Sequence, residues 1–150
     1  MSINIKLLPF ALVFPFLFIV SPPAYSKQSF GDYEGAVYVR NYDGDTITFN
    51  LPTLHPIIGK NISLRVNGID TPEIRGKCEK EIYDAEQARD MVSDILKDAG
   101  KIALKNLKRG KYFRIVADVY VDEENLAVML VEAGVAIPYS GGKKSKNWCE

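Results

Sequence analysis

The residues of this 150-residue chain that could do chemistry lie in two acidic motifs, Asp43-Gly44-Asp45-Thr46 and Asp70-Thr71-Pro72-Glu73. Carboxylates are hard oxygen donors that suit calcium or magnesium, and the sequence has no cluster of His and Cys that would suit zinc. Each motif alone is a weak signal, because Asp-Gly is common in hairpin turns and Thr-Pro-Glu often begins a helix. Together, and in this order, they predict a divalent-cation site.

Two arginines accompany these motifs at positions where strands are expected. Alternation of apolar and polar residues over 62–66 and 114–121 places Arg65 and Arg114 on the faces opposite the core. A guanidinium group matches the geometry of phosphate oxygens, so two on neighbouring strands could clamp one phosphodiester. The alternative is that each arginine is solvated or ion-paired, with Asp118 available to Arg114. The alternation alone does not decide between these interpretations.

The motifs and their order resemble the staphylococcal nuclease (thermonuclease) family over residues 33 to 139. Four segments carry the resemblance: residues 43–46, 65–73, 111–114 and 132–136. In that family Ca²⁺ is held by two aspartates and a threonine carbonyl, and the resemblance places these ligands on Asp45, Asp70 and Thr71.

The same resemblance implies a reaction and the residues that perform it. The family glutamate positioned as general base corresponds to Glu73, and the two phosphate-binding arginines correspond to Arg65 and Arg114. A calcium-dependent phosphodiesterase is therefore expected, cutting DNA and RNA with little sequence selection and leaving 3′-phosphate ends. Single strands should be preferred, because an OB-type groove binds unstacked backbone.

Further substrate contacts are implied at Lys111, Tyr112 and Tyr139. The chain departs from the family pattern near two of its segments. The spacing from Gly134 to Tyr139 is one residue shorter than in the founding member, and residues 74–78 replace a longer, mobile basic loop.

The overall charge does not favour a nucleic-acid partner. The chain has 19 Lys and Arg and 19 Asp and Glu, a formal net charge of zero, and the basic tail at Lys143, Lys144 and Lys146 is expected to be solvated. A site with its own cation and placed arginines can still bind a polyanion. The rival interpretation is a non-catalytic OB-fold module that binds nucleic acid or protein.

The elements that must position these residues follow from periodicity. Strands are predicted over 33–41, 46–51, 61–67, 101–107 and 112–121, and helices over 79–98 and 124–133. Residues 52–60 are predicted to form a loop, with His55 on its surface and without a catalytic role. This order predicts an α+β fold, a five-stranded OB-fold β-barrel with two packed α-helices.

Residues 1–26 have the features of a secretory signal peptide, which leaves a single domain over 27–150. Lys6 precedes an apolar run over 7–20, and small residues stand at Ala24 and Ser26. An uncleaved membrane anchor is the alternative, but the run is short for a span and two prolines interrupt it. The predicted protein is exported, periplasmic or secreted, with no membrane span after cleavage, and monomeric.

The two cysteines, Cys78 and Cys149, are consistent with a disulfide in an exported protein. The bridge would attach the C-terminal tail to the segment that follows Glu73. Two unrelated thiols are the alternative.

Overall fold

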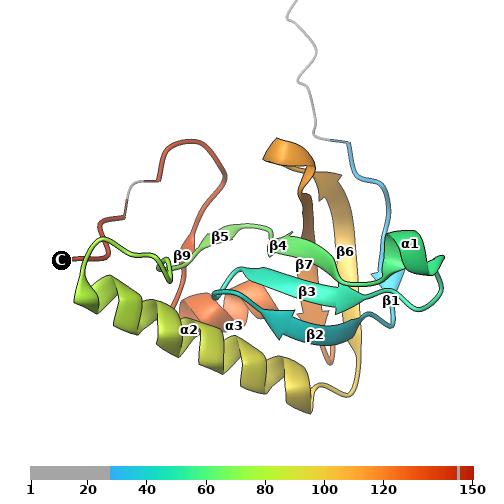
Figure 1. The fold of residues 1–150 in the computed structure, drawn as a ribbon, viewed down its shortest axis with the longest axis horizontal. Coiled ribbons are helices and arrows are strands. Elements are labelled where there is room, and N and C mark those ends of the chain that lie inside the picture. Colours follow the sequence, from blue (N-terminus) through green and yellow to red (C-terminus); the bar gives the residue numbers. More distant parts are fainter. Residues whose placement is uncertain (1–27, 145) are drawn as a thin grey trace, which may run out of the picture.

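The structure, a computed structural model, describes residues 28–144 and 146–150, so the predicted signal peptide lies outside the described residues. Figure 1 shows a curled sheet with a long helix packed along it. The elements are β1 (Tyr33–Glu34), β2 (Val37–Asn41), β3 (Thr46–Asn50), α1 (Pro56–Gly59), β4 (Ile62–Val66), β5 (Ile69–Asp70), α2 (Glu79–Asp98), β6 (Ile102–Arg109), the 3₁₀ turn η1 (Lys111–Phe113), β7 (Ile115–Val121), β8 (Glu124–Asn125), α3 (Leu126–Glu132) and β9 (Ile137–Pro138).

The main sheet is mixed and has the order β1-β6-β7-β4-β3-β2, with β8 paired to β7. Its pairs are antiparallel except for β4 and β7, which run parallel. The sheet curls into a half-barrel, so the predicted α+β, OB-type fold is confirmed. A separate short pair joins β5 to β9 and attaches the start of the C-terminal tail to the second acidic motif.

Several element boundaries differ from the prediction. The first predicted strand is divided into β1 and β2, and residues 56–59 form the short helix α1 inside the predicted loop. Pro56 supplies a preset backbone angle at the first helical position, and the exposed His55 caps the helix by accepting a bond from Ile57 N. Helix α3 begins later than predicted, because Glu124 and Asn125 pair with β7 as β8.

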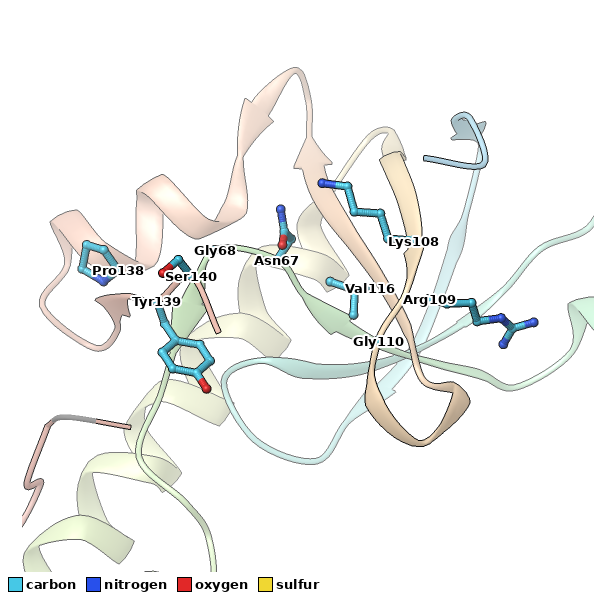
Figure 2. Close-up of a pocket in the computed structure, with 9 residues that line it drawn as sticks. All are labelled: Asn67, Gly68, Lys108, Arg109, Gly110, Val116, Pro138, Tyr139 and Ser140. Atoms are coloured by element: carbon cyan, nitrogen blue, oxygen red, sulfur yellow. The ribbon is translucent and has the colours of Figure 1, made fainter. Parts of the chain in front are cut away.

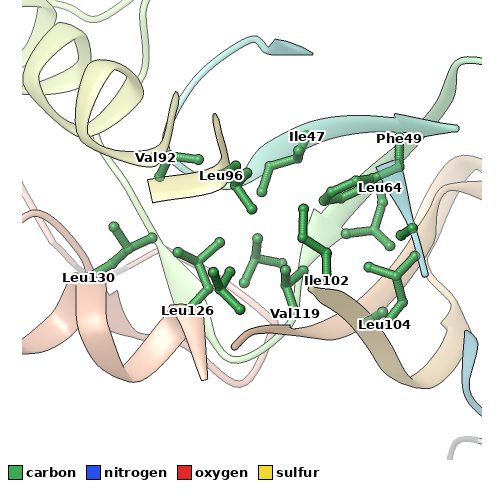
Figure 3. Packing of buried hydrophobic residues seen from close by; sticks show 14 of the residues in the cluster. Ile47, Phe49, Leu64, Val92, Leu96, Ile102, Leu104, Val119, Leu126 and Leu130 are labelled. Carbon is green, nitrogen blue, oxygen red and sulfur yellow. The ribbon is translucent and has the colours of Figure 1, made fainter. Parts of the chain in front are cut away.

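The hydrophobic core lies between the concave side of the sheet and helices α2 and α3 (Figure 3). Alternating residues of β3 and β4 enter it, and α2 contributes a stripe at helical spacing. Each fully buried Leu, Ile, Val or Phe contributes about 1.5–3 kcal/mol through removal of apolar surface from water. The largest of these side chains are Phe49, Ile47, Leu64, Ile69, Leu104, Leu126, Leu130, Val66, Val92 and Val119.

A disulfide between Cys78 and Cys149 joins the N-terminal end of α2 to the end of the chain. Lys80, in the first turn of α2, also donates to the carbonyl oxygen of Trp148 at 3.1 Å. The C-terminal tail is therefore attached at both ends, by β9 and by the disulfide. None of the helices over residues 28–144 and 146–150 is both long and apolar enough to cross a membrane.

Candidate active site

The acidic motifs meet because the strands that carry them are neighbours. Asp45 directly precedes β3, which pairs with β4 so that Thr46 lies opposite Arg65. The backbone continues this pairing, since Val66 N donates to the carbonyl oxygen of Asp45 at 2.8 Å. Asp70 ends β5, a few residues beyond Arg65, so the turn after β4 brings both aspartates to one end of the sheet.

Arg65 bridges the two buried aspartates. Its Nη1 lies 2.5 Å from Asp45 Oδ1 and its Nη2 lies 3.2 Å from Asp70 Oδ1. The Asp45 and Asp70 side chains are 2% and 1% exposed, whereas Arg65 keeps 15% of its surface accessible. Nη2 also donates to the carbonyl oxygen of Ile69 at 3.2 Å, which fixes the guanidinium plane between the two acids.

The site carries more negative charge than Arg65 offsets. Burial raises the pKa of Asp45 to about 7, with repulsion from Asp43 and Asp70 adding to the increase and Arg65 opposing it. Burial also raises the pKa of Asp43, against the bonds that its carboxylate accepts from the Asp45 and Thr46 backbone. Asp43, for which no separate role was predicted, lies beside Asp45 and contributes to this repulsion.

Two buried oxygens of the second motif lack hydrogen-bond partners, namely Asp70 Oδ2 and Thr71 Oγ1. Leaving such groups unpaired is costly, so these atoms indicate that a further ligand belongs beside them. The buried aspartates and the all-oxygen donor set fit a hard divalent cation. The Cys78, Glu81 and Cys149 group does not compete as a metal site, because both sulfurs are in the disulfide.

A cavity of about 310 Å³ lies beside the aspartates and brings together the three predicted catalytic residues and two of the three predicted substrate contacts. Arg65, Glu73, Arg114, Lys111 and Tyr139 all line it. Positive charge around the cavity comes from Arg65, Lys111, Arg114 and Lys144, and the buried carboxylate of Asp43 also lines it. Such an arrangement can hold an anion against a bound cation.

Arg114 lies immediately before β7 and not within it, which corrects its predicted place on a strand. Its side chain is exposed, and in the part of the chain that the structure describes it forms no ion pair with Asp118. Asp118 instead accepts from Asn67 and from Asn106, each at 2.7 Å. The Arg114 guanidinium is thus available to a ligand in the cavity.

The predicted substrate contacts are only partly brought together. Tyr139 lies with its ring 6.0 Å from the Arg65 guanidinium carbon, and its hydroxyl donates to the Gly142 carbonyl oxygen at 2.7 Å. Lys111 lines the cavity, but Tyr112 is 94% exposed and does not. The structure therefore groups Lys111 and Tyr139 with the site and places Tyr112 outside it.

Lys144 of the C-terminal tail reaches the site and forms ion pairs there, which the prediction of a solvated tail did not include, although its side chain stays 41% exposed. Its ammonium pairs with Glu73 and lies 2.9 Å from Asp70 Oδ1. Burial lowers the pKa of Lys144, but bonds to Glu73 and Asp70 outweigh that effect and raise the pKa overall. The cysteine pair was the available signal, because it brings the tail near Glu73.

The family model described as staphylococcal nuclease homologue matches residues 63–148. The matched region contains Arg65, Asp70, Glu73 and Arg114, while Asp45 precedes it on the hairpin that the structure places beside Arg65. No curated protein matches the chain.

Proposed function

The chain belongs to the staphylococcal nuclease family, and on that premise we propose that it is a calcium-dependent phosphodiesterase that hydrolyses DNA and RNA. The observation that carries the proposal is the convergence of Arg65, Glu73 and Arg114 on one cavity above the buried Asp45 and Asp70. A metal-dependent nuclease needs an anion site beside a cation site, and these residues could supply both.

Asp45, Asp70 and the Thr71 carbonyl would hold the calcium ion. A bound ion supplies positive charge next to a phosphate oxygen and so lowers the cost of charge that develops at phosphorus. The unpaired Asp70 Oδ2 supports this assignment, because a buried carboxylate oxygen without a partner is available to a ligand. The Asp45 carboxylate supports it too, because burial and the neighbouring Asp43 and Asp70 raise its pKa and a bound cation would oppose that effect.

Arg65 and Arg114 would bind the phosphate from the two sides of the cavity. Arg65 must give up part of its contact with Asp45 and Asp70 to do so, and these two carboxylates are the ones that would hold the calcium ion. Arg114 has no competing ion pair among the described residues and can turn directly toward the anion. Each arginine stabilises charge that increases in the transition state.

Glu73 would accept a proton from the attacking water or orient that water. Its side chain is about half exposed, so water reaches it from the cavity, but its carboxylate is paired with Lys144 in this structure. The Lys144 ammonium contacts Oε1 of Glu73, which leaves Oε2 of that carboxylate to a water in the cavity. Departure of the 5′-oxygen would leave 3′-phosphate ends.

Little sequence selection is expected, because the proposed contacts reach the phosphate and do not reach base edges. The cavity opens on a curled sheet face, which suits an unstacked single strand better than a duplex.

The direct test is hydrolysis of single-stranded DNA and of RNA by the purified protein in Ca²⁺, with chelator in a parallel reaction. Cleavage in Ca²⁺ alone, with 3′-phosphate ends detected by end-group analysis, would support the proposal. Intact substrate in both reactions, with nucleic acid still bound, would instead identify a non-catalytic module. Arg114→Ala serves as the matched control for contaminating nucleases.

We also propose that the protein is exported and that its mature domain begins near Lys27. The charged start, the apolar run over 7–20 and the small residues at Ala24 and Ser26 support this. A disulfide is consistent with an oxidising compartment. Determining the N-terminal residue of protein isolated from the culture medium and from a periplasmic fraction tests it, and an intact Met1 would contradict cleavage.

A further inference from the structure

A second cavity, of about 570 Å³, continues from the candidate active site toward β6 (Figure 2). The two cavities share part of their lining, including Asn67, Val116 and Tyr139. The second adds Lys108, Arg109 and Pro138, which are not among the predicted site residues. It therefore extends the site along the surface of the sheet, away from the aspartates.

A β-bulge in β6 places Lys108 in this cavity. Lys105 pairs with Asp118 of β7, and the next paired residues are Lys108 and Val116, so β6 advances three residues while β7 advances two. In a regular ladder Leu107 would lie opposite Val116, and Lys108 would point to the other side of the sheet. Because of the extra residue, Lys108 and not Leu107 lies opposite Val116. Bulges commonly redirect a side chain in this way next to active sites.

Side chains around the cavity hold the bulge in place. Asn106 has a φ of 52°, a left-handed conformation that is unfavourable for most residues. Its side chain donates to Asp118 Oδ2 and its backbone N–H donates to Asp32 Oδ1, at 2.7 and 2.8 Å. Asn67 donates to the other oxygen of Asp118. The Asp118 carboxylate is thereby occupied by two amide groups beside the cavity.

Register places Lys108 in line with the proposed phosphate clamp. Val116 pairs with Arg65 of β4 on one side and with Lys108 of β6 on the other. Paired residues on adjacent strands share a face, and two strand spacings separate Arg65 from Lys108 by about 10 Å between backbones. A lysine side chain on this row can reach a phosphate next to the one that Arg65 binds.

The lining has the chemistry of a nucleotide site. None of its residues is acidic, and Lys108 forms no ion pair with the residues that the structure describes. Arg109 is directed away, since its guanidinium donates to the Phe113 carbonyl oxygen at 2.7 Å. Lys108 thus provides a cation for a phosphate, while Val116, Pro138 and the Tyr139 ring offer apolar surface for a sugar or a base.

We propose that Lys108, which lines this cavity, is a further substrate-binding residue and binds the phosphate of the nucleotide adjacent to the scissile phosphate of a single strand. The inference rests on the proposed nuclease function and extends it to a substrate longer than one phosphodiester.

The test is binding of a fluorescein-labelled phosphorothioate oligothymidylate of about eight nucleotides, followed by anisotropy in Ca²⁺ over a range of salt concentrations. Phosphorothioate linkages keep the backbone charge and resist hydrolysis. Lys108→Gln should lower affinity several-fold at low salt and reduce the slope of log affinity against log salt by about 0.7, the value for one lost contact to a single-stranded phosphate. Lys108→Arg should keep the slope of the parent.

Lys105→Gln is the matched control, because Lys105 lies on the same strand but stacks on Tyr120, with its ammonium 4.2 Å from the ring centre. It should bind with the slope of the parent. If Lys108→Gln and the parent share one slope and one affinity, the assignment of Lys108 is wrong while the nuclease proposal stands. If the parent itself does not bind the oligonucleotide, both proposals fail.

Discussion

The Oδ1 atom of Asp70 lies 2.9 Å from the ammonium of Lys144, on the same oxygen that receives Nη2 of Arg65. Two cations of the chain thus converge on one carboxylate oxygen, while Oδ2 of the same group has no partner. A calcium ion that binds Asp70 must compete with both side chains. Lys144 is the more easily displaced, because it is 41% exposed and comes from the tail.

Lys144→Gln should increase calcium affinity by about three- to tenfold, since the incoming ion no longer displaces an ammonium from a partly exposed ion pair. Isothermal titration calorimetry of the metal-free protein measures this directly and requires no activity assay. Lys143→Gln is the control, because it removes the same charge from a neighbouring exposed residue. Equal calcium affinities for the two variants would show that Lys144 does not compete with calcium for Asp70.

The raised pKa of Asp45 predicts how the stability of the metal-free protein depends on pH. With a pKa of about 7 when folded and an ordinary value near 3.8, the folded protein holds a proton that the unfolded chain has lost. The free energy of unfolding should therefore fall as pH rises from about 4 to about 7, and then level off. Urea unfolding in chelator at several pH values measures the slope.

Asp45→Asn is the matched variant, because an amide of similar shape cannot titrate. The free energy of unfolding of this variant should change much less with pH over the same window. A smaller decrease should remain because burial also raises the pKa of Asp43. Calcium should reduce the loss of stability in the parent by binding the ionised carboxylate. A parent whose free energy of unfolding rises between pH 4 and 7 would contradict a raised pKa of Asp45 in the folded protein.

The two arginines should differ in what their removal costs. Arg114→Ala should lower kcat/KM by about 10²-fold, the usual scale for a lost transition-state donor, and leave the unfolding midpoint unchanged because Arg114 is exposed. Arg65→Ala should lower activity by a similar factor. It should also destabilise the metal-free protein, because Asp45 and Asp70 lose their shared counter-ion.

Steady-state kinetics and urea unfolding on both variants separate the two effects, with circular dichroism as a check of the fold. An Arg114→Ala protein that is fully active would remove Arg114 from the phosphate clamp, even if the protein cuts nucleic acid.

Local patterns allowed the sequence to predict the framework of the site. Alternation over residues 62–66 placed Arg65 opposite the core, and helical spacing predicted α2 with its observed bounds. The bulge at Asn106 could not be predicted, because one inserted residue leaves the apolar pattern of β6 almost unchanged and shows only in its pairing with β7. The position of Lys144 depends on contacts between distant segments, and periodicity carries no information about these.

The disulfide and the ion pair of Lys144 connect the same two segments. Cys78 follows Glu73 by five residues and Cys149 follows Lys144 by five, so the covalent bond and the ion pair cross-link the tail to the second acidic motif at two points. The bond closes a loop across a sequence separation of 71 residues, which corresponds to a stabilisation of about 4 kcal/mol through the entropy of the unfolded chain. The Cys78→Ser, Cys149→Ser double variant should lose stability on this scale in urea unfolding, and reductant should then leave its midpoint unchanged.

The same double variant should also bind calcium more tightly than the parent, because the Lys144 ammonium is no longer held near Asp70 from both ends of the tail. Adding Lys144→Gln to the double variant should produce little further gain in affinity. A full additional gain would mean that the tail keeps its place without the bond, and that β9 alone positions Lys144.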